Sequence, residues 1–197
     1  MIMKYFFYFI SIVQALLATN MAAQSLIKCS DKTSYWIIPD NKKNYAIKLT
    51  GDIDLSSQHD ILNVNDMALQ YILISKQQYS EKADDDKTIL LSYIAGETDY
   101  LRSKFRQHSF DVYPEVLLLD SDQTAVFWYF YLPEDKNKEV KAQLFINTMA
   151  EETIFGLGAP LFTENEFDSV KSFLIETLSS LTTVKNPELL CNTTIKQ

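Results

Sequence analysis

The chain has two histidines, His59 and His108, and these are the first candidates for proton transfer or metal binding. A metal site usually places two ligands on one face through spacings such as His-x-x-x-His, and neither histidine has such a partner. Asp60 follows His59, and His108 lies between Arg106 and Asp111. We interpret both histidines as surface residues, and we predict no metal ligands and no catalytic residues in the chain.

Other catalytic signatures are also missing from the sequence. It contains no Gly-x-Ser-x-Gly motif, and its four glycines form no phosphate-binding loop. The acidic runs 84–86 and 120–122 offer carboxylates to calcium but lack the ligand spacing of an EF-hand. Glu151 and Glu152 fit a hairpin turn better than the paired carboxylates of a glycosidase. The sequence therefore favours a non-enzymatic protein without a cofactor, with a hydrolase as the third-ranked alternative.

Cys29 and Cys191 are the only cysteines, and they lie near opposite ends of the chain. Two cysteines in a secreted protein usually pair, and no Cys-x-x-Cys motif favours a redox site instead. We predict a disulfide between them, which closes a loop long enough to contribute about 5 kcal/mol on chain-entropy grounds.

Residues 1–23 are typical of a secretory signal peptide. Lys4 precedes an apolar run over 5–17, and Ala22 and Ala23 offer a cleavage site. The alternative is a retained membrane anchor, but the run is shorter than the roughly 20 residues that span a bilayer. We expect a secreted or periplasmic protein in which residues 24–197 form one domain and no stable membrane span is left after cleavage.

The net charge of −8 limits the partners that this protein attracts. Phosphates of nucleic acid and anionic lipid headgroups are repelled by an acidic surface. The sequence therefore argues against nucleic acid and anionic membranes, and we expect a protein partner or a small apolar ligand. Its oligomeric state is left open.

Residues 124–132 are the strongest structural signal in the chain. These nine residues carry no charge, and five of them are aromatic, as is typical of a buried strand. Because side chains alternate along a strand, the segment presents two apolar rows. One row contains Val126, Trp128 and Phe130, and the other contains Phe127, Tyr129 and Tyr131.

The next segments predict partner strands and a helix. Residues 140–148 alternate as a half-buried strand, and 153–158 can supply another short strand. Thr163 and Glu166 fit a capping box, which predicts that the helix begins within a residue or two of Thr163. Its apolar stripe contains Phe167, Val170, Leu174, Leu178 and Leu181.

The first half of the chain has weaker secondary-structure signals. Strands are predicted at 34–39, 45–50, 61–64 and 67–75, with another at 112–120 in which Pro114 restricts hydrogen bonding. A helix is predicted over 87–106, with a weak point at Gly96. The alternative for this segment is a strand at 88–94 followed by a shorter helix from Glu97.

Residues 111–183 also resemble a known family. The aromatic strand precedes the sequences Ile-Phe-Gly-Leu-Gly-Ala-Pro and Ser-Phe-Leu-Ile-Glu-Thr-Leu-Ser-Ser-Leu, and together they resemble the C-terminal half of Mog1/PsbP-like proteins. The resemblance implies an α+β fold, in which helices pack on the faces of an antiparallel sheet. It also implies a binding or assembly factor without catalytic residues.

The remaining functional prediction concerns aromatic side chains. The helix after Thr163 covers only one row of 124–132, so the other row is either covered by the 87–106 helix or partly open. If the row with Phe127, Tyr129 and Tyr131 is open, with Phe145 beside it, it forms a binding surface. The competing interpretation is that these residues only fill the core. We expect a secreted accessory or protein-binding module, with a carrier of a small apolar ligand as the alternative.

Overall fold

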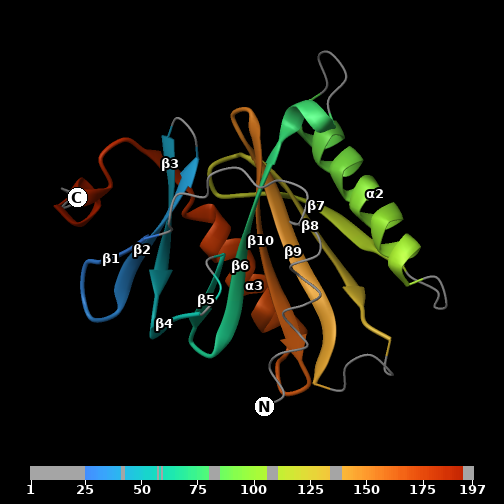
Figure 1. Cartoon of the computed structure of the whole chain (residues 1–197), viewed down its shortest axis with the longest axis horizontal. Helices are drawn as coiled ribbons and strands as arrows, with labels where there is room; N and C mark the ends of the chain where they lie inside the picture. Colours follow the sequence, from blue (N-terminus) through green and yellow to red (C-terminus); the bar gives the residue numbers. More distant parts are fainter. Residues whose placement is uncertain are drawn as a thin grey trace.

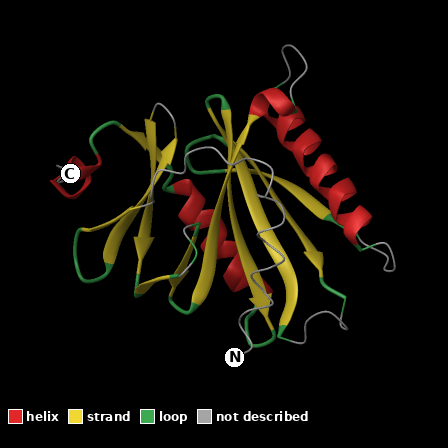
Figure 2. Ribbon diagram, viewed as in Figure 1, coloured by secondary structure: helices red, strands yellow, loops and turns green. Residues whose placement is uncertain are grey.

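The computed structural model describes residues 25–40, 43–56, 58, 60–79, 85–105, 111–133 and 139–192. The predicted signal peptide, both histidines and Asp84 lie outside these residues. The described part is an α+β fold with two antiparallel sheets and two α-helices (Figures 1 and 2).

The larger sheet has seven strands, and β7 and β4 are its two edges. The neighbours in order are β4 (Ile53–Leu55), β5 (Ile61–Val64), β6 (Met67–Ser75), β10 (Thr153–Phe162), β9 (Val140–Ala150), β8 (Thr124–Tyr131) and β7 (Tyr113–Leu118). All six strand pairs are antiparallel. The aromatic strand predicted from the sequence is therefore β8, which lies one position in from the edge. A 3-10 turn, η1 (Lys76–Gln78), follows β6.

Beside the larger sheet, the remaining strands form a second antiparallel sheet of four strands. Its order is β1 (Ser25–Lys28), β2 (Thr33–Asp40), β3 (Lys43–Thr50) and β11 (Thr182–Val184). The β2–β3 hairpin packs on the larger sheet through edge-to-face ring contacts, Trp36 with Tyr71 and Tyr45 with Phe155. The outer strands β1 and β11 are only four and three residues long, so their sequences give no alternating pattern.

Helix α2 (Asp86–Lys104) confirms the predicted helix over the alternative strand. Asp85 caps its start, because the Asp85 carboxylate accepts a hydrogen bond of 2.8 Å from the Thr88 amide. The helix continues through Gly96 and buries Leu90, Tyr93 and Ile94 against β8. It therefore covers one face of the larger sheet.

Helix α3 (Phe167–Ser179) shows that the predicted capping box was wrong. The helix begins four residues after Thr163, its N-cap is Glu166, and no side chain caps it. The Thr163 amide instead donates to the Glu139 carbonyl at 2.9 Å, and the Thr163 hydroxyl donates to the Glu164 carboxylate at 3.2 Å. A turn closed between Phe162 and Asn165 then separates the strand from the helix. These contacts hold Thr163 at the end of the sheet, where it cannot cap the helix.

The apolar stripe of α3 is confirmed at its centre. Val170, Leu174 and Leu178 are fully buried against the larger sheet, on the side opposite α2. In Figure 1, α3 passes behind the strands. The face of the larger sheet that carries α3 is therefore also the face on which the β2–β3 hairpin packs.

Strand β10 is longer than the predicted 153–158 and contains Pro160. It pairs with β6 only as far as Gly158 but pairs with β9 along its whole length. Beyond Gly158 the side facing β6 no longer pairs, so a proline is tolerated there although it has no amide hydrogen. This is why a segment containing proline continues as a strand.

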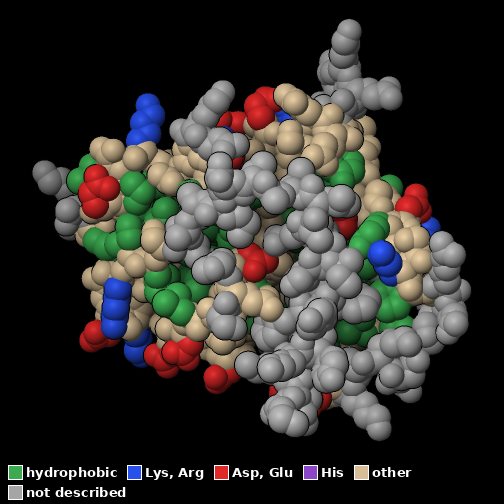
Figure 3. Space-filling view, viewed as in Figure 1, with side chains coloured by type: hydrophobic (Ala, Val, Ile, Leu, Met, Phe, Trp, Pro, Cys, Tyr) green, Lys and Arg blue, Asp and Glu red, His purple; other side chains and the backbone are tan. Residues whose placement is uncertain are grey.

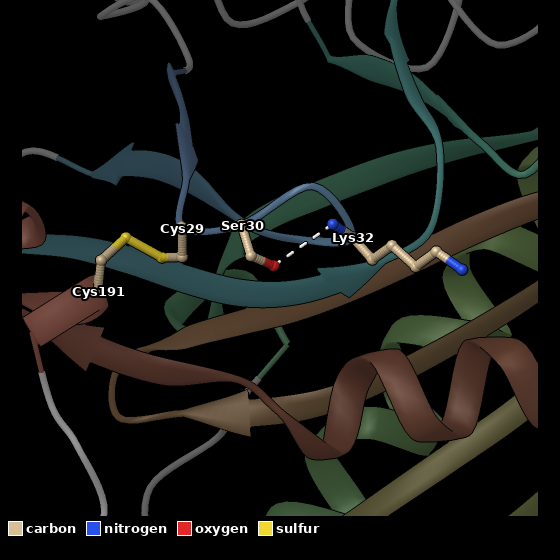
Figure 4. The surroundings of a disulfide bond; sticks show 4 residues. All are labelled: Cys29, Ser30, Lys32 and Cys191. Atoms are coloured by element: carbon tan, nitrogen blue, oxygen red, sulfur yellow. Dashed lines mark hydrogen bonds between the residues drawn. A yellow bond between two sulfur atoms is a disulfide. The ribbon is translucent and has the colours of Figure 1, made fainter.

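The predicted disulfide is confirmed. Cys29, which follows β1, is bonded to Cys191 in the 3-10 helix η2 (Pro187–Asn192), with 5.1 Å between the Cα atoms. Figure 4 shows this bridge beside the turn in which the Ser30 hydroxyl accepts from the Lys32 amide at 3.3 Å. The bridge joins the two ends of the described chain. None of the helices among the described residues is long and apolar enough to cross a membrane.

Candidate binding surface at the β7–β8 edge

The two side-chain rows of β8 have different environments. Val126, Trp128 and Phe130 are at most 3% exposed and belong to the cluster under α2. In the other row, Phe127 is fully buried, Tyr129 is partly exposed and Tyr131 is 54% exposed. The row on the α3 face is therefore buried at one end and open at the other.

Phe145 does not lie on this open row, which corrects the prediction that placed it beside Tyr129 and Tyr131. It pairs directly with Trp128, and residues opposite each other in an antiparallel pair point to the same face. Its ring stacks on Trp128 with 4.4 Å between centroids, on the α2 face. The alternation within each strand was right, but the register between β8 and β9 decides which rows share a face.

Glycines on β10 make room for the side chains of this α2 face. A Cβ atom at Gly158 would lie 2.9 Å from the Phe145 ring, and one at Gly156 would contact the Asn147 amide nitrogen. The Asn147 side-chain oxygen Oδ1 accepts a hydrogen bond from the Trp128 indole N–H at 2.7 Å. Phe145 and Asn147 therefore belong to the packing beneath α2.

Tyr113 of β7, and not Phe145, lies beside Tyr129 on the α3 face. It pairs directly with Tyr129, and the two rings stack with centroids 5.0 Å apart. The Tyr131 ring meets Tyr129 edge-on at 5.7 Å and Tyr113 at 6.4 Å. We call Tyr113, Tyr129 and Tyr131 the tyrosine patch. The sequence predicted a strand at 112–120, but no local signal indicated that Tyr113 would lie beside Tyr129.

Residues of α3 pack against the residues of β7 and β8 that form and adjoin the tyrosine patch. Phe167 lies in the first turn of α3. The centroid of its ring is 4.8 Å from that of Tyr129 and 6.0 Å from that of Phe127, and both ring pairs meet edge to face. Lys171, one turn further on, pairs with Glu115 of β7 at 2.6 Å and lies 5.1 Å from the centroid of the Phe127 ring. The patch therefore rests on a fixed aromatic and ionic base, which restricts the tyrosine rings before any partner arrives.

The Tyr129 hydroxyl is an uncharged donor near neutral pH. Desolvation raises the pKa of Tyr129 above its ordinary value of 10.0, and the Tyr131 and Tyr113 hydroxyls add to the rise. Such side chains combine a large apolar ring with a polar tip, which suits recognition of a protein surface.

Two further apolar side chains extend the exposed region along β7. Val116 is 44% exposed and Leu118 is 73% exposed, and both lie on the face of β7 opposite Tyr113, which is itself 44% exposed. Both faces of this edge thus expose apolar side chains. Figure 3 shows the α2 side of the molecule, where hydrophobic side chains gather beside the helix and over the strands at the left.

Glu151 and Glu152, the carboxylate pair of the glycosidase alternative, form ion pairs with lysines in the structure. Glu151 and Glu152 form the β9–β10 turn, as predicted, and pair with Lys43 at 2.8 Å and Lys76 at 2.6 Å. Within the described ranges, no three His, Cys, Asp or Glu side chains are grouped so that they could hold a metal ion. The carboxylates at the β9–β10 turn thus form ion pairs that tie the hairpin to β3 and to η1.

Comparisons with known proteins concern the fold. No protein-family model and no curated protein matches the sequence. Among solved structures, the chain is similar to the solution structure of cyanobacterial PsbP (CyanoP) from Synechocystis sp. PCC 6803. The similarity covers 86% of this chain and 98% of CyanoP, with a TM-score of 0.49 and 12% sequence identity. PsbP is also part of the Mog1/PsbP-like resemblance noted for residues 111–183.

Proposed function

We propose that this chain is a secreted, non-enzymatic protein-binding module whose partner docks on the tyrosine patch. The observation that carries the proposal is the concentration of exposed apolar side chains at one edge of the larger sheet. Tyr113 and Tyr131 are exposed on the face of the tyrosine patch, and Val116 and Leu118 are exposed on the opposite face of the same edge. Large exposed apolar groups that lie together are typical of interaction sites, whereas single ones are common on any protein surface.

Secretion is supported by two features of the chain. Residues 1–23 have the pattern of a signal peptide, and the Cys29–Cys191 disulfide is of a kind that persists in oxidising compartments. Amino-terminal sequencing of the exported protein should begin at Gln24, and an intact amino terminus would contradict cleavage.

A photo-crosslinking amino acid placed at Tyr131 tests the binding surface in the native compartment. We expect one discrete crosslinked product, which disappears when Tyr113→Ala removes the ring next to the probe. Leu55 is a matched control position, because it is 71% exposed and lies on β4, the other edge of the same sheet.

The outcomes decide the proposal directly. Equal products from positions 131 and 55, or no product from position 131, would contradict it. Tyr131→Ala should lower the free energy of unfolding by about 1 kcal/mol or less, since half of the side chain is already in water. A larger loss of stability would assign the residue to the core.

A further inference from the structure

Strand β7 forms one edge of the larger sheet as the structure describes it. Among the described strands it pairs only with β8, and six of its residues extend along the sheet. The opposite edge, β4, has only three residues. Natural proteins protect sheet edges by shortening them or by placing charges and prolines on them, and of these devices β7 carries Pro114 and the ion-paired Glu115.

The backbone of β7 offers hydrogen-bonding groups to a further strand. The Leu119 amide donates to the Gln123 carbonyl at 3.0 Å, so the backbone groups of Leu119 point toward β8. Backbone groups in an antiparallel strand alternate in direction, so those of Leu118, Val116 and Pro114 point away from β8. Pro114 has no amide hydrogen to lose, which fits an outward position. Two amides and three carbonyls thus face outward.

Charge at this edge indicates which kind of strand it accepts. Between Asp111 and Leu132 the chain carries four carboxylates and neither Lys nor Arg. Lys171 neutralises Glu115, so the negative charge is left on exposed Asp111 before β7 and on exposed Asp120 and Asp122 after it. A complementary strand has an apolar centre and basic residues at both ends.

We propose that β7 binds an extended segment of a partner protein as an eighth strand, with Lys or Arg on each side of a short apolar stretch. The inference rests on the proposed function, because the same partner then reaches the tyrosine patch from the added strand. Backbone hydrogen bonds supply affinity in this mode, and alternate side chains contact Tyr113 on one face and Val116 and Leu118 on the other.

A second copy of this chain fits the edge poorly. Antiparallel pairing of two β7 strands about Val116 would place Asp111 of one copy between Asp120 and Asp122 of the other. This arrangement occurs at both ends of the pair, and each Asp111 then lies diagonally next to two like charges, which repel it. The charge distribution therefore favours a basic partner over self-pairing.

The test uses the oxidised protein and a synthetic peptide of about ten residues, the length of a typical strand with short flanks. Lysines at each end flank alternating valine and threonine. We expect the peptide to slow hydrogen exchange of the Val116 and Leu118 amides about tenfold, because both become hydrogen-bonded. The Leu55 amide, at the other edge, serves as the internal control.

Variants separate backbone pairing from side-chain contact. Val116→Pro removes one outward amide, and Val116→Thr keeps it with a similar branched shape. We expect the proline variant to bind the peptide about tenfold more weakly than the threonine variant, as the loss of about one hydrogen bond implies. N-methylation of alternate peptide amides should weaken binding in the same way, and so should glutamates in place of the lysines.

Each outcome is decisive. Equal binding by both Val116 variants, unchanged exchange of the two amides, or undiminished binding of the glutamate peptide would overturn the inference. Sedimentation showing a dimer whose β7 amides are already protected would make a second copy the occupant and would also overturn it. If only Tyr131→Ala weakens capture of the partner, the patch binds through side chains, so the proposed function stands while strand addition fails.

Discussion

Removing the disulfide should be the most destabilising change available outside the core. The perturbation is the double variant Cys29→Ser with Cys191→Ser, which keeps the size of the side chains and removes the cross-link. The two cysteines are separated by 162 residues, so the bond closes nearly the whole described chain into one loop. Chain-entropy reasoning for a loop of this length gives a loss of about 5 kcal/mol in the free energy of unfolding.

The disulfide lies where few other contacts depend on it. Cys29 and Cys191 join β1 and η2, and β1 otherwise pairs only with β2 among the described strands. Few other contacts depend on the bond, so the constraint on the unfolded chain should dominate its effect. Urea unfolding followed by tryptophan fluorescence measures it, and a loss of about 5 kcal/mol lowers the midpoint by about 2.5 M for a slope near 2 kcal/mol/M.

Ser30→Ala in the oxidised protein is the control, because it removes the neighbouring turn hydrogen bond and leaves the bridge intact. That variant should change the midpoint by less than about 0.5 M, as expected for one exposed hydrogen bond. A shift of the double-serine variant no larger than that of the control would refute the loop-entropy reasoning.

Three further changes test the packing on the α2 face. Asn147→Ala should lower the free energy of unfolding by about 1–3 kcal/mol, since it leaves the Trp128 indole without its acceptor, and chemical denaturation would detect it. Gly156→Ala should cost about 1–3 kcal/mol in the same assay, because its Cβ would overlap the Asn147 side-chain amide. Gly96→Ala in α2 should cost less, because its Cβ would meet only the edge of the Tyr79 ring at 3.3 Å and alanine favours a helix. Equal effects would contradict the packing described. Burial raises the pKa of Glu97 above 4.5, so the folded state favours its protonated form, and stability is lost as pH rises through the raised pKa. Glu97→Gln should therefore raise thermal stability at pH 7 and have no effect below about pH 4; the same effect at both pH values would exclude Glu97 as its source.

Local patterns in the sequence were sufficient for most of the elements. Alternation in 124–132 and 140–148 predicted β8 and β9, and the period of 3.6 in Val170, Leu174 and Leu178 predicted the buried stripe of α3. These patterns follow from the backbone geometry of a strand or a helix, so they can be read without any partner. The cysteine pair was predictable for a similar reason, because the chain offers only one combination.

Other features depended on contacts between distant segments. A capping box at Thr163 was a sound local interpretation, but the bond to the Glu139 carbonyl keeps that residue at the end of the sheet. The strands β1 and β11 form because β2 and β3 offer them an edge, although their own sequences are too short to predict a strand. Tertiary contacts overrode local preference at these positions.

The candidate site shows the same division. The sequence alone determined that Phe127, Tyr129 and Tyr131 share one row of a strand. Only the tertiary structure decided that this row lies on the α3 face, that Tyr113 stacks beside it and that Phe145 belongs to the other side. Strand order and register are set by pairing between segments far apart in the chain, and a shift of one residue moves every side chain to the opposite face.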